Sequence, residues 1–157
     1  MTSLLNIEPT RKLGKASGVA ERVLIDTGPL FAIFSAKDPD HKVCVEVLRT
    51  FSGPLLTTWP VLTETVYLLR SHAEAVDTLL LQVEEGKLYS VVDLGVEFTA
   101  WSRKFFKRFH DREAQLADAS LVYLAEREGI DTVFTLDRRD FPVYRTSAGK
   151  ALKVIPV

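Results

Sequence analysis

The chain has 157 residues, 46% of them hydrophobic and 26% charged, a composition that suits one globular domain with an adequate core. The formal net charge of −1 excludes a whole-molecule field that attracts nucleic acid or membranes, so any basic binding surface has to be local. The single cysteine, Cys44, excludes an internal disulfide and a multi-cysteine zinc site, and no apolar stretch reaches the roughly 18 residues of a membrane span. Because the N-terminus also lacks a signal-peptide pattern, we expect a cytoplasmic protein with no membrane partner.

The N-terminal segment differs from the rest of the chain. Residues 1–21 mix Thr, Ser, Gly and Lys without sustained periodicity, and we interpret them as a mobile extension. No repeat or linker divides residues 22–157, which are therefore expected to form one domain.

From residue 22 onward, short apolar runs alternate with segments of helical periodicity. Strands are predicted at 23–25, 55–58, 88–92, 131–136 and 152–155. Helices are predicted after Pro29, between Asp40 and Ser52, and at 61–70, 71–85, 95–110 and 115–128. This alternation predicts an α/β fold, a three-layer α/β/α sandwich around a central, mostly parallel sheet of about five strands.

Four acids fall at equivalent places on this map. Asp26 and Asp137 each follow directly on a buried strand, and Asp26 also precedes the helix that Pro29 opens. Glu64 and Asp118 lie near the amino ends of their helices, on the side that carries apolar neighbours. Because helix amino ends follow strand carboxyl ends in a βα unit, all four acids are expected to converge on one edge of the sheet.

Such a cluster of carboxylates requires compensation of its charge. The acids repel one another and resist desolvation, and the sequence places no Lys or Arg at those same positions. A divalent cation would compensate the charge, and oxygen ligands without His or Cys suit Mg²⁺ or Mn²⁺. The alternative is that Glu64 and Asp118 are ordinary helix N-terminal acids favoured by the helix dipole.

The sequence around these acids resembles the motifs of PIN-domain nucleases, most closely the VapC-type toxins of bacterial toxin–antitoxin pairs. The motifs are Asp26-Thr-Gly-Pro-Leu, Leu62-Thr-Glu64, Leu116-Ala-Asp118-Ala-Ser-Leu-Val-Tyr-Leu-Ala125 and Thr135-Leu-Asp137-Arg-Arg-Asp140-Phe141. The motifs occur in the family's order, and the resemblance covers about Arg22 to Val157, nearly everything but the N-terminal extension. Gln115 departs from the pattern, because close relatives often have another acid there.

The resemblance implies a metal-dependent ribonuclease, a hydrolase that cleaves RNA phosphodiester bonds endonucleolytically. The implied catalytic acids are Asp26, Glu64, Asp118 and Asp137, with Asp26, Asp118 and Asp137 as ligands of Mg²⁺ or Mn²⁺. Supporting roles are implied for Thr27, Thr135 and Asp140, with Thr135 supporting Asp137. A toxin of this kind requires a small antitoxin protein as its partner.

Local basic residues are candidates for holding RNA. We name Arg108, Arg112, Arg138 and Arg139, which lie directly before the Asp118 helix or directly after Asp137. The competing interpretation is that they form a solvated helix face. Phosphate contacts supply affinity without sequence choice, so the RNA target stays open.

Three other functions remain as alternatives. One is a PIN-domain nuclease for RNA processing without a toxin role, and another is a non-catalytic domain of the same fold that binds RNA or a partner. A response-regulator-like domain would require a Lys at the end of a late strand, whereas Lys150 and Lys153 precede or begin the last strand.

The segment 60–85 carries more apolar residues than one buried stripe requires, namely Val61, Leu62, Val66, Leu68, Leu69, Val76, Leu79, Leu80 and Leu81. Surplus exposed apolar surface commonly marks an interface. We therefore expect a homodimer.

Overall fold

The computed structural model describes residues 21–156, so all but the last residue of the expected extension 1–21 lies outside the described residues, as does Val157. The elements, in chain order, are β1 (Leu24–Ile25), α1 (Thr27–Phe34), α2 (His41–Leu48), β2 (Leu55–Thr57), α3 (Trp59–Leu69), α4 (Ala73–Glu85), β3 (Tyr89–Val91), α5 (Glu97–Arg108), α6 (Leu116–Glu128), β4 (Thr132–Phe134) and β5 (Lys153–Ile155). Every predicted strand and helix is present, with ends that differ by a few residues.

The sheet has five strands in the order β3-β2-β1-β4-β5, and every neighbouring pair is parallel. The predicted fold class is therefore confirmed. The first strand is central, since Leu24 pairs with Leu56 on one side and with Val133 on the other. All five carboxyl ends consequently meet at one edge, which is where open α/β sheets bind ligands.

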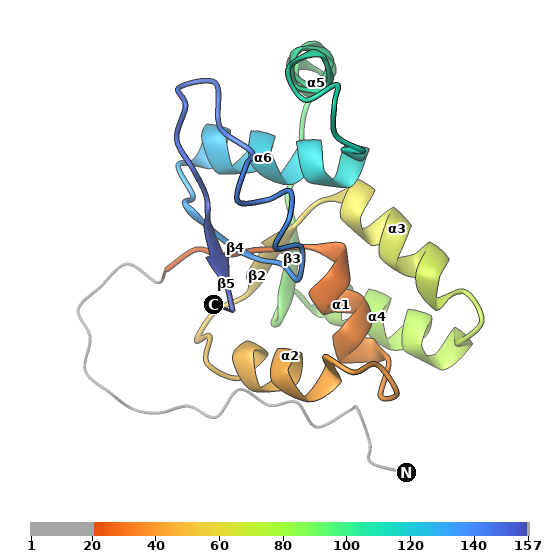
Figure 1. Cartoon of the computed structure of the whole chain (residues 1–157). Helices are drawn as coiled ribbons and strands as arrows, with labels where there is room; N and C mark the ends of the chain where they lie inside the picture. Colours follow the sequence, from red (N-terminus) through yellow and green to blue (C-terminus); the bar gives the residue numbers. More distant parts are fainter. Residues whose placement is uncertain (1–20, 157) are drawn as a thin grey trace.

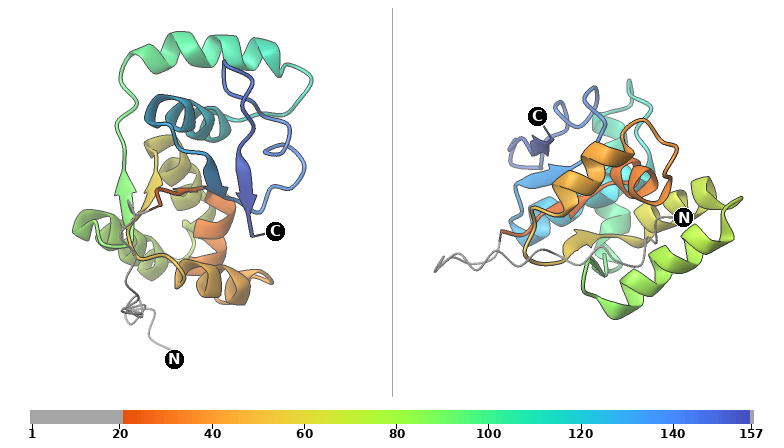
Figure 2. Two further views of the ribbon diagram at one scale, coloured as in Figure 1. Left: turned by 90° about the vertical axis from the view of Figure 1, so that its left-hand side faces the viewer. Right: turned by 90° about the horizontal axis from the view of Figure 1, so that it is seen from below.

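Helices cover both faces of the sheet. Helices α5 and α6 lie on one side of it, and α1, α2 and α4 lie on the other (Figures 1 and 2). A strand that is covered on both faces has a continuous run of apolar residues in its sequence. Leu24, Ile25, Val133 and Phe134 fit this rule, because none of them has exposed surface.

Helix α6 is buried along most of its length and ends at Gly129, whose φ of +66° suits a glycine in a C-terminal cap. It packs against α3, and the hydroxyls of Thr58 and Ser120 lie 2.6 Å apart across this contact. Helix α3 also packs against α1, so the amino ends of α1, α3 and α6 approach the same edge of the sheet. Within residues 21–156, neither α6 nor any other helix is long and apolar enough to cross a membrane.

Helix α5 is amphipathic, as its sequence predicts. Phe98, Phe105 and Phe109 are buried against the domain, and Phe105 packs on Tyr144 with ring centroids 5.2 Å apart. Its opposite face carries basic side chains, and its last turn contains Lys107 and Arg108. The aromatic face therefore fixes where these cations lie.

Candidate functional site

The carboxyl edge of the sheet contains a cavity of about 350 Å³ that is lined by all four predicted acids. We call it the acid cavity. Its lining residues are Asp26, Thr27, Gly28, Glu64, Glu113, Gln115, Asp118, Asp137, Arg139 and Asp140. The structure therefore brings together acids that are separated by up to 111 residues of sequence (26 to 137).

Asp26 is the most enclosed of these acids, with 7% of its surface exposed. It precedes α1 as its N-terminal cap: Oδ1 accepts a hydrogen bond of 2.7 Å from the Thr27 amide, and Oδ2 accepts one of 2.7 Å from the Thr135 hydroxyl. Burial raises the pKa of Asp26 from 3.8 to about 7, although the Thr135 hydrogen bond opposes the rise and the Asp118 charge adds to it. An uncompensated Asp26 therefore holds its proton close to neutral pH.

Glu64 reaches the same cavity from α3. Its Oε2 accepts a hydrogen bond of 2.7 Å from the hydroxyl of Thr27, the residue that directly follows Asp26. Thr27 thus joins two acids, since its amide donates to Asp26 and its hydroxyl donates to Glu64.

Asp118 lies in the first turn of α6. Its Oδ2 accepts a hydrogen bond of 2.7 Å from the Gln115 amide, and the hydroxyl of Tyr144 lies 3.5 Å from the same oxygen. Asp118 therefore also caps its helix, and its position in the first turn agrees with the alternative raised for it, an acid favoured there by the helix dipole. Burial raises its pKa to about 6, and the charges of Asp137 and Glu64 contribute to the rise.

Asp137 lies in the loop after β4, where the backbone holds it. Its Oδ1 accepts hydrogen bonds from the amides of Arg139 at 2.8 Å and Asp140 at 2.9 Å. Thr135 contacts this residue too, because its hydroxyl oxygen accepts a hydrogen bond of 3.0 Å from the Asp137 amide. The proton of that hydroxyl is donated to Asp26, so one threonine links the ends of β1 and β4.

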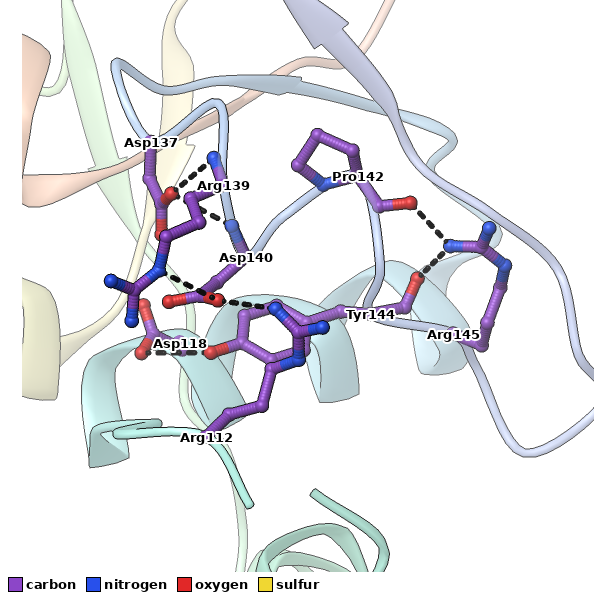
Figure 3. Close-up of polar contacts among 8 residues, drawn as sticks. All are labelled: Arg112, Asp118, Asp137, Arg139, Asp140, Pro142, Tyr144 and Arg145. Atoms are coloured by element: carbon purple, nitrogen blue, oxygen red, sulfur yellow. Dashed lines mark hydrogen bonds and ion pairs between the residues drawn. The ribbon is translucent and has the colours of Figure 1, made fainter. Parts of the chain in front are cut away.

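Asp140 differs from the other acids because it forms ion pairs with two arginines. Its Oδ1 lies 2.7 Å from Nη1 of Arg112 and 3.5 Å from Nε of Arg139 (Figure 3). The Arg112 hydrogen bond holds the pKa of Asp140 below its ordinary value. The charge of Asp140 is therefore compensated by two guanidinium groups at the rim of the acid cavity.

The donor set of the cavity fits a hard divalent cation, because every acid offers oxygen and no His or Cys is among the lining residues. Glu64, Asp118 and Asp137 each have one carboxylate oxygen that makes no hydrogen bond within residues 21–156. In the same range, no three His, Cys, Asp or Glu side chains are already arranged around a common point as metal ligands. Binding of a cation would therefore require these side chains to close round it.

The four arginines named as RNA contacts fall in different places. Arg139 lines the acid cavity, and Arg112 joins its rim through Asp140. Arg138 is exposed and is not a lining residue. Arg108 lies elsewhere: its Nη1 donates to the Thr146 carbonyl at 3.1 Å, and it lines a second, smaller cavity.

Sequence reasoning missed two residues at this site. Glu113 lines the acid cavity from the turn before α6. The only feature of the sequence that could have indicated this is its position two residues before Gln115. Tyr144 is fully buried and reaches Asp118 from an irregular loop, where no periodicity indicates its direction.

Comparison with known proteins places this cavity in context. No protein-family model matches the chain. The chain is 31% identical over 136 residues to the ribonuclease VapC26 of Mycobacterium tuberculosis (strain ATCC 25618 / H37Rv), an alignment that covers 85% of this chain and 100% of that protein.

Two solved structures are similar in fold. One is M. tuberculosis VapC20, a toxin that cleaves the sarcin–ricin loop, with a TM-score of 0.64 and 18% identity over 71% of this chain and 86% of the other. The second is a chain from VapBC2 of Rickettsia felis bound to a DNA fragment from its promoter, with a TM-score of 0.59 and 14% identity over 85% of this chain and 98% of the other.

Proposed function

The chain belongs to the VapC family of ribonucleases, and on that premise we propose that its acid cavity hydrolyses RNA phosphodiester bonds with the help of Mg²⁺ or Mn²⁺. The observation that carries this proposal is the convergence of Asp26, Glu64, Asp118 and Asp137 on one cavity. We further propose that the chain acts as the toxin of a toxin–antitoxin pair.

The raised pKa values of Asp26 and Asp118 support a cation in the cavity. Burial without a compensating positive charge favours the protonated forms of both acids, so a bound cation would stabilise the ionised forms. Asp26, Asp118 and Asp137 would hold it, with Glu64 as a further acid beside it. When bound, the cation supplies charge neutralisation at the phosphate and acidifies a coordinated water.

The chain's own residues orient these acids. Thr135 fixes Oδ2 of Asp26, and Thr27 fixes Oε2 of Glu64, so both carboxylates are held before RNA arrives. Arg139 and Arg112 stand at the rim, where their guanidinium groups would contact the phosphates of the RNA strand. Such contacts position the strand and leave its sequence unread.

We propose an antitoxin as the protein partner. The solved VapBC2 complex supports a pairing of this kind. The acid cavity is the surface that an inhibitor has to block, and a Lys or Arg placed among its carboxylates would compensate their charge in place of the cation. The antitoxin is expected to be a short chain that reaches this edge of the sheet.

We also propose that the chain forms a homodimer through α3 and α4. Among the apolar residues that suggested this interface, Val61, Leu62, Leu69 and Leu79 are buried in the core. Others remain on the surface: Leu68 is 42% exposed, Leu80 40% and Leu81 39%, and Tyr67 on α3 is 61% exposed. Sedimentation at tens of micromolar is expected to give a dimer, and a monomer there would contradict this proposal.

Growth of a bacterium that expresses the chain tests the toxin proposal. Wild type is expected to slow growth, and Asp26→Asn is expected to relieve the effect because it removes a metal-binding charge at constant side-chain size. Both proteins have to be compared at equal soluble levels, with the fold of the variant checked by circular dichroism. Equal growth in the two strains would remove the toxin role and leave a nuclease for RNA processing.

A further inference from the structure

A second cavity lies between α5 and the loop after Phe141. Its volume is about 60 Å³, which suits a single phosphate group better than a whole nucleotide. Three cations line it, Lys104, Arg108 and Arg145, together with the aromatic side chains of Trp101, Phe105 and Phe109. We call it the cationic notch.

Both arginines of the notch are held in place by backbone carbonyls. Arg145 Nη1 donates to the Pro142 carbonyl at 2.7 Å and to the Tyr144 carbonyl at 2.8 Å (Figure 3). Arg108 Nη1 donates to the Thr146 carbonyl at 3.1 Å, and its guanidinium carbon lies 5.3 Å from the centroid of the Phe109 ring. Each guanidinium keeps further N–H groups for an anion, because it carries five donors in a fixed fork.

The positive charge of the notch is not cancelled by ion pairs. Within residues 21–156, no carboxylate oxygen lies within 4.0 Å of a charged nitrogen of Lys104, Arg108 or Arg145, whereas Arg112 and Arg139 both pair with Asp140. One acid, Glu126, contacts the lining, and its oxygens accept hydrogen bonds from the Trp101 indole and from the Ser147 amide. Three cations therefore face one acid that already has two partners.

Tyr144 connects the notch to the acid cavity. Its hydroxyl lies 3.5 Å from Oδ2 of Asp118, and its ring packs on Phe105 and Phe109 of the notch at 5.2 Å between centroids. Figure 3 shows this side chain between Asp118 on one side and Arg145 on the other. Tyr144, with the rings of Phe105 and Phe109, therefore forms a continuous buried connection between the two cavities.

From this arrangement we infer that the cationic notch is a second phosphate site for the RNA strand whose scissile phosphate lies in the acid cavity. The inference rests on the proposed function, since it requires RNA as the substrate. Lys104 and Arg108 lie four residues apart on one face of α5, and Arg145 faces them from the loop, so one phosphate is held from two elements of the fold. The notch supplies affinity and register to the strand, and the acids supply the chemistry.

The test measures RNA binding without cleavage. Full-length Asp26→Asn protein in EDTA is titrated with fluorescent poly(U) fragments at several salt concentrations. Adding Arg108→Ala and Arg145→Ala is expected to weaken binding several-fold and to reduce the slope of log K against log salt by about 0.7, the value for one lost phosphate contact to a single strand. Arg49→Ala is the matched control, an exposed arginine at the end of α2 on the other side of the sheet, and it is expected to leave the slope unchanged.

A further variant tests the notch without removing a contact that the fold requires. Lys104 is exposed, and its side chain makes no hydrogen bond or ion pair within the described residues, so Lys104→Glu alters the charge of the notch without removing a side-chain contact. It is expected to weaken poly(U) binding more than Arg49→Glu does.

The possible outcomes separate the two proposals. If poly(U) binds the parent protein and the notch variants keep its affinity and salt slope, the notch is not a phosphate site and the proposed function is unaffected. If poly(U) binds neither the parent protein nor any variant at any salt concentration, the notch inference fails, whereas RNA as the substrate is decided separately by the cleavage assay with Mg²⁺.

Discussion

The hydroxyl of Thr135 donates a hydrogen bond of 2.7 Å to Oδ2 of Asp26, although 109 residues of sequence separate them. Thr135 has no exposed surface, so water cannot replace the bond if the hydroxyl is lost. The contact connects the end of β4 to the most enclosed acid of the cavity and opposes the rise in its pKa.

Thr135→Val is expected to lower both stability and activity. The substitution keeps the shape of the side chain but removes the donor, and a hydrogen bond to a charged group contributes about 1.5–3 kcal/mol to the free energy of unfolding. Urea unfolding at pH 8 measures the loss. Thr65→Val is the matched control, because Thr65 is equally buried and donates to the Val61 carbonyl away from the acids. An equal loss of RNA cleavage in both variants would contradict a specific role for Thr135.

The metal-free protein is expected to lose stability as pH rises from about 4 to about 7. The pKa of Asp26 is 3.8 when unperturbed and about 7 in the folded protein, so the folded state binds more protons across this window. Stability falls with pH wherever the folded state is the more protonated one. Unfolding in EDTA at several pH values measures the slope, and Asp26→Asn is expected to flatten it. A slope for wild type equal to that of Asp26→Asn would show that Asp26 does not titrate in this way.

Mg²⁺ or Mn²⁺ is expected to raise the melting temperature, because a ligand that binds only the folded state stabilises it by about 2.7 kcal/mol at a hundred times its Kd. Asp118→Asn is expected to reduce or abolish the rise, since it removes the charge of one proposed ligand. Asp77→Asn is the control, an acid on α4 outside the cavity. Calorimetry that detects no divalent binding to wild type at millimolar concentration would remove the metal from the proposed mechanism.

Arg112→Ala is expected to weaken RNA binding more than Arg138→Ala. The first substitution removes a cation from the rim and also leaves Asp140 without its 2.7 Å partner, whereas Arg138 neither lines the cavity nor forms an ion pair with a residue that does. Adding Asp140→Asn to Arg112→Ala is expected to restore part of the affinity, because it removes a carboxylate charge that keeps only its longer ion pair, to Arg139. A double-mutant cycle on RNA affinity measures this coupling, and strict additivity would contradict it.

Much of the fold can be predicted from local signals in the sequence. Buried strands such as 23–25 and 131–136 are apolar runs bounded by turn residues. Such runs are typical of strands that are covered on both faces in a parallel sheet. The positions of Asp26 and Asp137 after those strands then predict a shared edge. Glu64 and Asp118 could be placed only through their apolar helix neighbours, which is a weaker signal.

The contacts within the cavity could not be predicted, because they depend on tertiary packing. The sequence suggested that Thr135 supports Asp137, yet the hydroxyl proton goes to Asp26 on another strand. Nothing local indicates that Asp140 pairs with Arg112, 28 residues away, or that Tyr144 turns toward Asp118. The sequence also could not predict which apolar residues of α3 and α4 stay exposed, because both helices carry apolar residues on more than one face.

The central claim is that the acid cavity cleaves RNA, and cleavage of a mixed RNA pool by the purified protein tests it most directly. Wild type, Asp26→Asn and the control Asp77→Asn are incubated with Mg²⁺ or with EDTA. We expect endonucleolytic products from wild type and Asp77→Asn with Mg²⁺, and none in EDTA or from Asp26→Asn. Products of equal yield from Asp26→Asn, or no cleavage by wild type with either Mg²⁺ or Mn²⁺, would contradict the claim.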